Sequence, residues 1–280
     1  MFGFLLVMKA EIVRSWIIMR RYWFRTLTGL IIGYGMLVVL VMGFMASSEQ
    51  VEQAMSRNFE SAAAATNFVL GFIIGMFAFG VVGMFTQGLQ GMARTGILEQ
   101  LCMSPHGLIT NFMARSIVSA VTTIASSAVM VYMVSLTFGE ALHFHPAETL
   151  LLLTLTFINL LGFGFMMGGL VLVFKQVGQV AILIRMMLFG LAIYANEDIL
   201  HQGRVARSLM HALPITDAAI CLKHVLIKDH VLADGTVLPL LQHPSLFYLV
   251  LSCLLWTGIG IACFKSMENW SRARGTLGAY

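Results

Sequence analysis

The sequence has 280 residues, of which 59% are hydrophobic and only 11% are charged, and its formal net charge is +4 at pH 7. Soluble domains carry about 25% charged residues, so this composition excludes an ordinary soluble protein. We expect an integral membrane protein that contacts the lipid bilayer and has no nucleic-acid partner.

Residues 1–26 precede the first long apolar run and are apolar first and basic afterwards. This order is the reverse of a secretory signal peptide, and no small-residue cleavage site follows. Aromatic residues mixed with arginine are typical of a helix that lies in the cytoplasmic interface of the membrane; here they are Arg14, Trp16, Arg20, Arg21, Trp23 and Phe24. The same residues could instead be only the basic flank of the first span, and both interpretations can hold together.

The apolar residues that follow form continuous runs close to the length of about 20 residues that a helix needs to cross a bilayer. Backbone groups within lipid find no water to bond, so each run must be helical. The pattern predicts an all-α polytopic membrane protein, with one transmembrane domain over residues 1–280. Its six predicted transmembrane helices are Leu27–Met45, Asn67–Leu89, Ile117–Phe138, Thr149–Phe174, Gln176–Ala195 and Ser245–Phe264. Glycine pairs that would allow close helix packing occur at Gly29/Gly33, Gly71/Gly75 and Gly164/Gly168.

The distribution of basic residues predicts the orientation of these helices. With the N-terminus in the cytoplasm, most lysines and arginines outside the spans fall on the inner side, as the positive-inside rule requires. The basic residues on the outer side are Arg57, Arg204, Arg207, Lys223 and Lys228. We therefore expect both termini in the cytoplasm, and we expect the membrane to be the bacterial inner membrane.

A polar insert, RTGILEQLCMSPHG (residues 94–107), separates the second and third predicted spans. Three of its apolar residues fall on one face of a short amphipathic helix: Ile97, Leu98 and Leu101. Serine is a good N-cap and proline is tolerated at the first helical position, so Ser104-Pro105 should end this helix and begin the next. A helix–break–helix over residues 94–113 could transmit the movement of a soluble partner to the membrane helices. An ordinary short loop with an interfacial helix explains the pattern equally well.

Arg185 is the one charged residue within the six predicted spans, which contain no Asp, Glu or His. It follows Lys175 by about ten residues, or about 15 Å along a helix, which is too deep for comfortable snorkelling. We expect it to face a subunit interface or a wet cavity; if the fifth span begins later, Arg185 would lie at the membrane interface instead. The lack of buried carboxylates argues against transport coupled to an ion gradient.

No metal or nucleotide site is expected in this chain. His143 and His145 share a short outer loop and are better explained as solvated side chains than as metal ligands. No Gly-Lys dipeptide occurs, so the G-x-x-x-x-G-K-[ST] loop that cradles phosphates is missing. Energy for any transport would therefore come from a partner or from an ion gradient.

Two segments resemble the type-two permeases of ATP-binding-cassette exporters. In that family a G-x-L-E-x-L…S-P signature follows the second of six spans, and this chain carries Arg94, Gly96, Leu98-Glu99, Leu101 and Ser104-Pro105. The segment LPITDAAICLKHVL (residues 213–226) is similar to the family's outer segment before the last span. Lys223 stands there where arginine is usual.

The resemblance implies a paired permease, with a second copy or a paralogue, in which each subunit docks a separate ATPase subunit that binds ATP and Mg. Residues 94–103 would be the coupling helix, with Glu99 as its polar contact and Ile97 on its apolar face. Residues 196–243 would contain a re-entrant hairpin that includes Pro214, Thr216 and Lys223. A plain amphipathic helix on the outer surface is the alternative.

The substrate is indicated only by class. The spans are rich in Met, Phe, Leu and Gly, which favours an amphipathic or lipid-linked cargo over a free ion or sugar. The resemblance implies export, with no cofactor in this chain. An ion-coupled transporter and a non-transporting membrane scaffold remain as alternatives.

Overall fold

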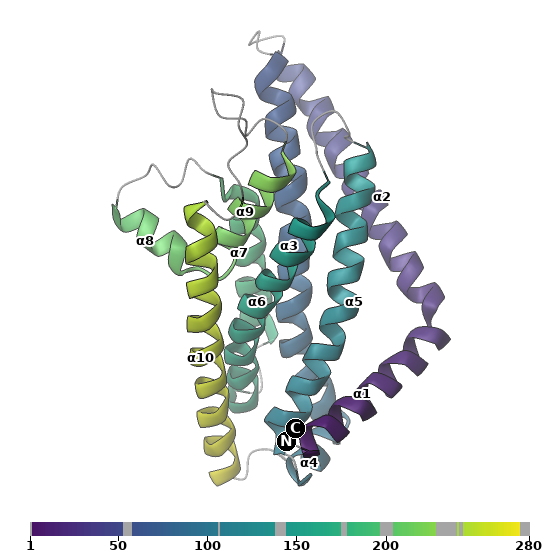
Figure 1. Ribbon diagram of the computed structural model, residues 1–280, viewed down its shortest axis with the longest axis vertical. Coiled ribbons are helices and arrows are strands. Elements are labelled where there is room, and N and C mark those ends of the chain that lie inside the picture. Colours follow the sequence, from purple (N-terminus) through teal and green to yellow (C-terminus); the bar gives the residue numbers. More distant parts are fainter. Residues whose placement is uncertain are drawn as a thin grey trace.

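The computed structural model describes residues 2–52, 58–105, 107–137, 144–174, 178–196, 204–227, 240 and 243–274. No β-strand occurs among these residues, so the all-α prediction is confirmed. In chain order the helices are α1 (Phe2–Arg21), α2 (Trp23–Glu52), α3 (Asn58–Arg94), α4 (Ile97–Cys102), α5 (Gly107–Thr137), α6 (Pro146–Phe174), α7 (Gly178–Tyr194), α8 (Arg204–Ala212), α9 (Thr216–Leu226) and α10 (Pro244–Ala273) (Figure 1).

Each predicted span overlaps a helix, but not every one of these helices is long and apolar enough to cross a membrane. Four of them are long and apolar enough among the described residues: α3 from Thr66 onward, α5, α6 and α10. A fifth span results if α1 and the start of α2, which meet at a bend of 70°, are counted together. α7 has 17 residues, fewer than the about 20 that a span requires. The count of six spans therefore remains a prediction.

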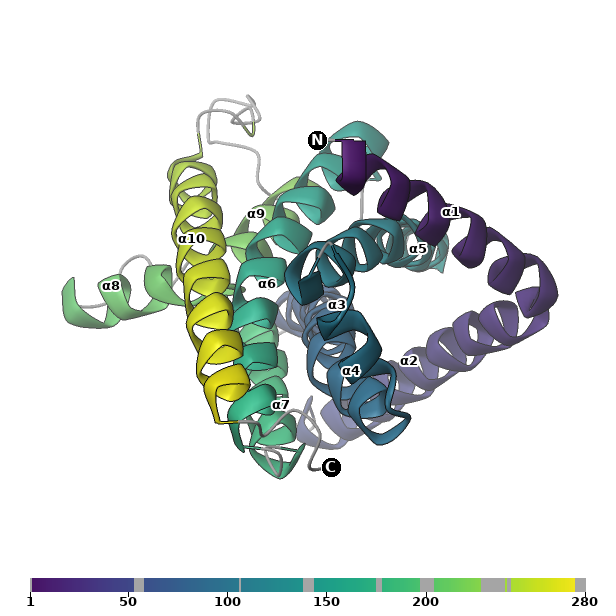
Figure 2. The ribbon, with the colours of Figure 1, turned by 90° about the horizontal axis from the view of Figure 1, so that it is seen from below.

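Helices α3 and α6 form the interior of the bundle, whereas only a minority of the residues in the apolar stretches of α5 and α10 are buried. Seen from below, α6 lies between α10 and α3 (Figure 2). Four phenylalanine rings join these helices through mostly edge-to-face contacts, a geometry that adds to the burial of each ring: Phe85, Phe112, Phe165 and Phe264.

Glycines bring several helices into backbone contact. A Cβ on Gly260 of α10 would strike the carbonyl of Gly162 of α6, so these two helices touch main chain to main chain. Two of the predicted glycine pairs also lie in close contacts, since Gly71 and Gly75 meet α7, and Gly164 and Gly168 meet side chains of α3. The third pair does not: a Cβ on Gly29 would meet no atom within 4 Å, and one on Gly33 would meet only Met130, at 3.9 Å.

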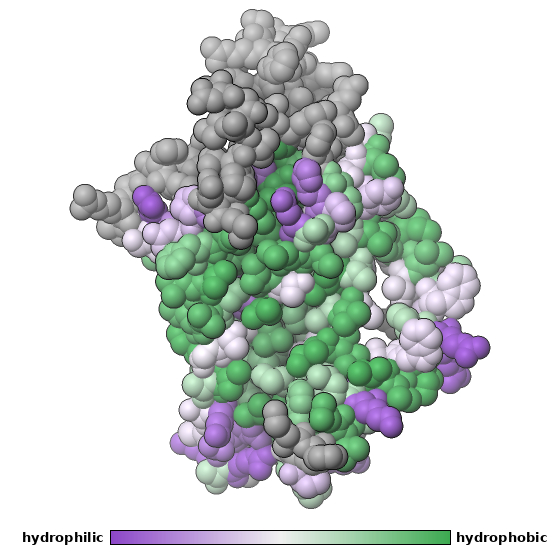
Figure 3. Space-filling model, viewed as in Figure 1, coloured by the Kyte–Doolittle hydropathy of each residue, from purple (hydrophilic) through white to green (hydrophobic). Residues whose placement is uncertain are grey.

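Hydrophobic residues cover the middle of the bundle. α4, the start of α1 and the end of α10 lie at one end (Figure 1). Green hydrophobic residues form a broad band across the middle of the face in Figure 3, and hydrophilic residues gather at the α4 end, at the corner between α1 and α2, and toward the opposite end. This arrangement agrees with a bundle that is embedded in lipid through its middle.

Candidate functional site

The polar insert forms a short elbow between two long helices. α3 ends at Arg94, which is exposed, and α4 follows after a turn at Gly96. Gly96 and Gly107 have φ values of 71° and 73°, in the left-handed region that favours glycine. These two glycines let the chain reverse sharply on each side of α4.

The break after α4 is fixed by a side chain that sequence reasoning missed. The Nδ2 atom of Asn111 donates hydrogen bonds to Ser104 Oγ at 2.9 Å and to the carbonyl of Gly107 at 2.7 Å. α5 begins at Gly107 and not at Pro105, which is exposed, so the prediction of Ser104 as an N-cap was wrong. The Ser104 hydroxyl accepts a hydrogen bond from the side chain of Asn111, about one helical turn into α5, and not from a backbone N–H of that helix.

The predicted apolar face of α4 divides between two environments. Leu98 is only 1% exposed and Leu101 packs against the same core, so both anchor α4 to this chain. Ile97 is 45% exposed and Met103 is 80% exposed. The side chain of Glu99 lies outside the described part of the structure. Leu98 therefore cannot enter a cleft of a partner, whereas Ile97 and Met103 can.

Arg185 lies between two helices of its own chain. It is 4% exposed, its Nε donates to the carbonyl of Phe79 at 2.9 Å, and its guanidinium carbon lies 3.6 Å from the centre of the Phe79 ring. A Cβ on Gly83 would lie only 2.5 Å from the same guanidinium. This packing does not agree with a guanidinium that faces a subunit interface or a wet cavity, while the alternative position at the membrane interface stays a prediction. The guanidinium instead fills the space that Gly83 leaves between α3 and α7.

Helices α8 and α9 form a hairpin whose tip lies well below the upper ends of α6 and α10 (Figure 1). Asn159 Nδ2 donates to the carbonyl of Pro214 at 2.8 Å, and Trp256 Nε1 donates to that of Ala212 at 3.1 Å. Asn159 and Trp256 each lie roughly 18–20 Å along their helices from the first residue. Thr216, the first residue of α9, is buried. The tip is therefore held near the middle of two long apolar helices.

Lys223 on α9 closes the end of α7. Its ammonium donates to the carbonyls of Ile193 and Ala195 at 2.9 and 2.8 Å and to Asn196 Oδ1 at 3.0 Å. A cation at this position complements the negative end of the helix dipole. Burial lowers the pKa of Lys223 to about 8. Lys223 thus binds the C-terminal end of α7, a contact that the sequence pattern around Lys223 did not predict.

A polar contact between His211 and Asp217 joins the two helices of the hairpin. His211 Nδ1 lies 2.7 Å from Asp217 Oδ1, and the imidazole stacks on Tyr248 of α10 with 4.1 Å between ring centres. Burial is the main cause that raises the pKa of Asp217 to about 6, while His211 opposes it. The described residues contain no group of three or more His, Cys, Asp or Glu side chains that could hold a metal; His143 lies outside them.

Comparison with known proteins adds one match. A family model described as ABC-2 type transporter matches residues 7–224, from within α1 to within α9. No curated protein matches the sequence significantly. The matched region contains the elbow around α4 and nearly all of the α8–α9 hairpin.

Proposed function

The chain belongs to the ABC-2 type transporter family, and on this premise we propose that it is the membrane subunit of an ATP-binding-cassette exporter. It moves an amphipathic or lipid-linked substrate outward, and a separate ATPase subunit binds ATP and Mg. The α4 end of the bundle, with both termini, faces the cytoplasm of a bacterial cell.

The elbow around α4 is the observation that carries this proposal. Its anchor (Leu98), its two left-handed glycines and the Asn111 hydrogen bonds hold α4 at a defined angle to α3 and α5. Ile97 and Met103 face outward, and burial of such a side chain against a partner contributes about 1.5–3 kcal/mol. A partner that binds these residues and moves would displace α3 and α5 together, because α4 is fixed to both.

The α8–α9 hairpin serves as the re-entrant segment on the opposite side. Backbone at membrane depth that does not span is tolerated where protein covers it, and the tip carbonyls of Ala212 and Pro214 are bonded by Trp256 and Asn159. Movement of α6 or α10 would pass directly to this tip.

Two buried polar side chains of the long helices are already engaged within the chain. Asn159 is engaged by Pro214 and Ser252, and Arg185 is engaged by α3. The described helices otherwise expose apolar side chains, among them Leu183 on α7 and Leu254 on α10. This favours a lateral, lipid-like path.

Transport in reconstituted vesicles tests the proposal against its two alternatives. The chain would be reconstituted with the ATPase subunit that copurifies with it, and uptake of fluorescent amphipathic and lipid-linked compounds would be measured. We expect uptake that requires ATP and persists when a protonophore collapses the proton gradient. Uptake by the chain alone under an ion gradient would indicate a secondary transporter. An assembled, ATP-hydrolysing complex that moves none of the compounds would indicate a scaffold.

A further inference from the structure

Helix α1 is covered by protein on one narrow side only. Its partly buried residues repeat at helical spacing and pack toward α5, and they include Val7, Glu11 and Ser15. The remainder of the helix is exposed and strongly apolar, with Leu5, Leu6, Ile12, Val13, Trp16 and Ile17 at 50% exposure or more. In a helix at the membrane interface, an apolar surface of this extent is available for contact with lipid.

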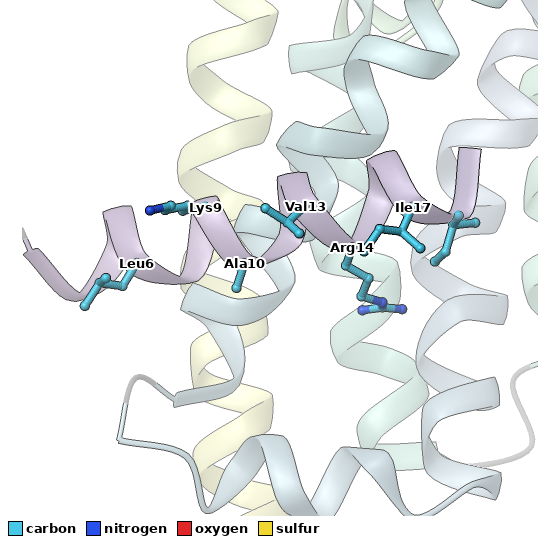
Figure 4. Close-up of a pocket in the computed structure, with 7 residues that line it drawn as sticks. Leu6, Lys9, Ala10, Val13, Arg14 and Ile17 are labelled. Carbon is cyan, nitrogen blue, oxygen red and sulfur yellow. The ribbon is translucent and has the colours of Figure 1, made fainter. Parts of the chain in front are cut away.

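A shallow cavity of about 570 Å³, largely open to its surroundings, runs along this exposed side, and all the residues that line it belong to α1. Its floor is an apolar stripe at helical spacing: Leu6, Ala10, Val13 and Ile17. Lys9 and Arg14 border the stripe, and their side chains leave α1 in different directions (Figure 4). A second cavity, of about 410 Å³, continues along α1 and is lined by Trp16, Ile17, Arg20 and Arg21.

Positive charge is concentrated where α1 meets α5. The charges of Arg14 and Glu11 both act on the guanidinium of Arg115, which is half-buried on α5. Arg115 Nη1 donates to the thioether of Met92 at 3.3 Å, and a thioether is a weak acceptor. Glu11 holds Arg14 at 2.8 Å. Arg14 and Arg115 therefore share a single carboxylate, that of Glu11, and the junction has an excess of positive charge.

We propose that the junction of α1 and α5 binds an anionic phospholipid. Arg14 and Arg115 bind the phosphate, with Lys9 at the far edge of the cavity, and an acyl chain lies along the apolar stripe. The excess positive charge selects an anionic headgroup, and the stripe beside it selects a lipid over a free phosphate ion. A second copy of α1 fits poorly, because a symmetric contact would place these cations against themselves.

Lipid binding by the purified full-length chain tests this site without any transport assay. Native mass spectrometry would follow titration with phosphatidylglycerol and, separately, with phosphatidylcholine of the same acyl chains. The attraction of one cation to an anionic lipid corresponds to roughly a fivefold change in affinity. We therefore expect Arg14→Gln and Arg115→Gln each to weaken phosphatidylglycerol binding about fivefold and to leave phosphatidylcholine binding unchanged. Arg14→Lys should retain most of the affinity.

Arg207→Gln, at an exposed position on α8, is the matched control and should bind as the wild type does. If Arg115→Gln fails to fold, Arg14→Gln and Lys9→Gln decide the test, because both residues are exposed. Undiminished phosphatidylglycerol binding by the variants that fold would overturn the proposal. Equal affinity for the two lipids would do the same, as would displacement of the lipid by inorganic phosphate at similar concentration.

Discussion

The side-chain amide of Asn159, deep in α6, donates a 2.8 Å hydrogen bond to the carbonyl of Pro214 at the tip of the α8–α9 hairpin. The same amide bonds Ser252 Oγ of α10 at 3.1 Å. Asn159 thus connects the tip of the hairpin to both α6 and α10. This link connects movement of the bundle to the side opposite α4.

Removal of this amide should loosen the hairpin. Asn159→Leu leaves the Pro214 carbonyl and the Ser252 hydroxyl without this donor in a buried place, which costs about 1–3 kcal/mol per group. We expect a lower melting temperature of the purified chain. Ser252→Ala should cost less, because Asn159 keeps its bond to Pro214. Thr154→Val is the control, since Thr154 is exposed and bonds only its own helix; equal melting temperatures for Asn159→Leu and this control would contradict the account.

The contact between Arg185 and Gly83 predicts non-additive effects of mutation. Gly83→Ala places a methyl group against the guanidinium and should destabilise the wild type by about 1–3 kcal/mol. In an Arg185→Ala background the methyl group has room, so the same change should cost much less. Thermal unfolding of the four chains of this double-mutant cycle measures the coupling. Gly80→Ala, which meets no atom within 4 Å, should be tolerated in both backgrounds.

The contact between Gly162 and Gly260 makes a similar prediction for α6 and α10. Gly260→Ala inserts a methyl group into the main chain of α6 and should lower stability by at least about 1–3 kcal/mol. Gly258→Ala, two residues away on the same helix and in open space, should be neutral or stabilising because alanine favours helix. Equal melting temperatures for the two variants would show that the helices do not touch there.

The buried Asp217 should make stability depend on pH. Its pKa is about 6 in the folded chain against an ordinary value of 3.8, so the folded state binds the proton more tightly than the unfolded state. The stabilisation that comes from the protonated Asp217 carboxyl is therefore fully present below pH 3.8 and is lost as the pH rises through 6. The shift corresponds to roughly 3 kcal/mol.

Melting curves of the wild type and Asp217→Asn between pH 4 and 7 check this sign. The stability of the wild type relative to the variant should fall as the pH rises, and at pH 7 the variant should be at least as stable. Glu148→Gln, at an exposed acid, should show no such trend. If the wild type instead became more stable relative to Asp217→Asn as the pH rises, the ionised carboxylate would be the form that stabilises the hairpin.

Local pattern predicted the helices and the position of the elbow, because hydrophobic runs and turn residues act over short distances in the chain. It did not reveal which face of α4 is buried, since Leu98 and Ile97 are equally apolar and only the neighbouring helices distinguish them. The partners of Arg185, Lys223 and Asn159 lie between 27 and 106 residues away. Such pairings depend on how the helices pack, which no spacing within a single helix encodes.

Docking of the ATPase subunit at α4 is the interaction on which the proposed function depends. Ile97→Asp and Met103→Asp place a charge on the two exposed apolar residues of the elbow, with Ile97→Val and Met103→Leu as conservative controls. Leu98→Asp is unsuitable, because a charge at this buried position should unfold the permease itself. The measurement is the amount of ATPase that copurifies with each full-length variant, beside its melting temperature. We predict that the two Asp variants keep the wild-type melting temperature and lose the ATPase and ATP-driven export, while the controls keep both. Wild-type copurification and export by both Asp variants would contradict the assignment of α4 as the coupling helix.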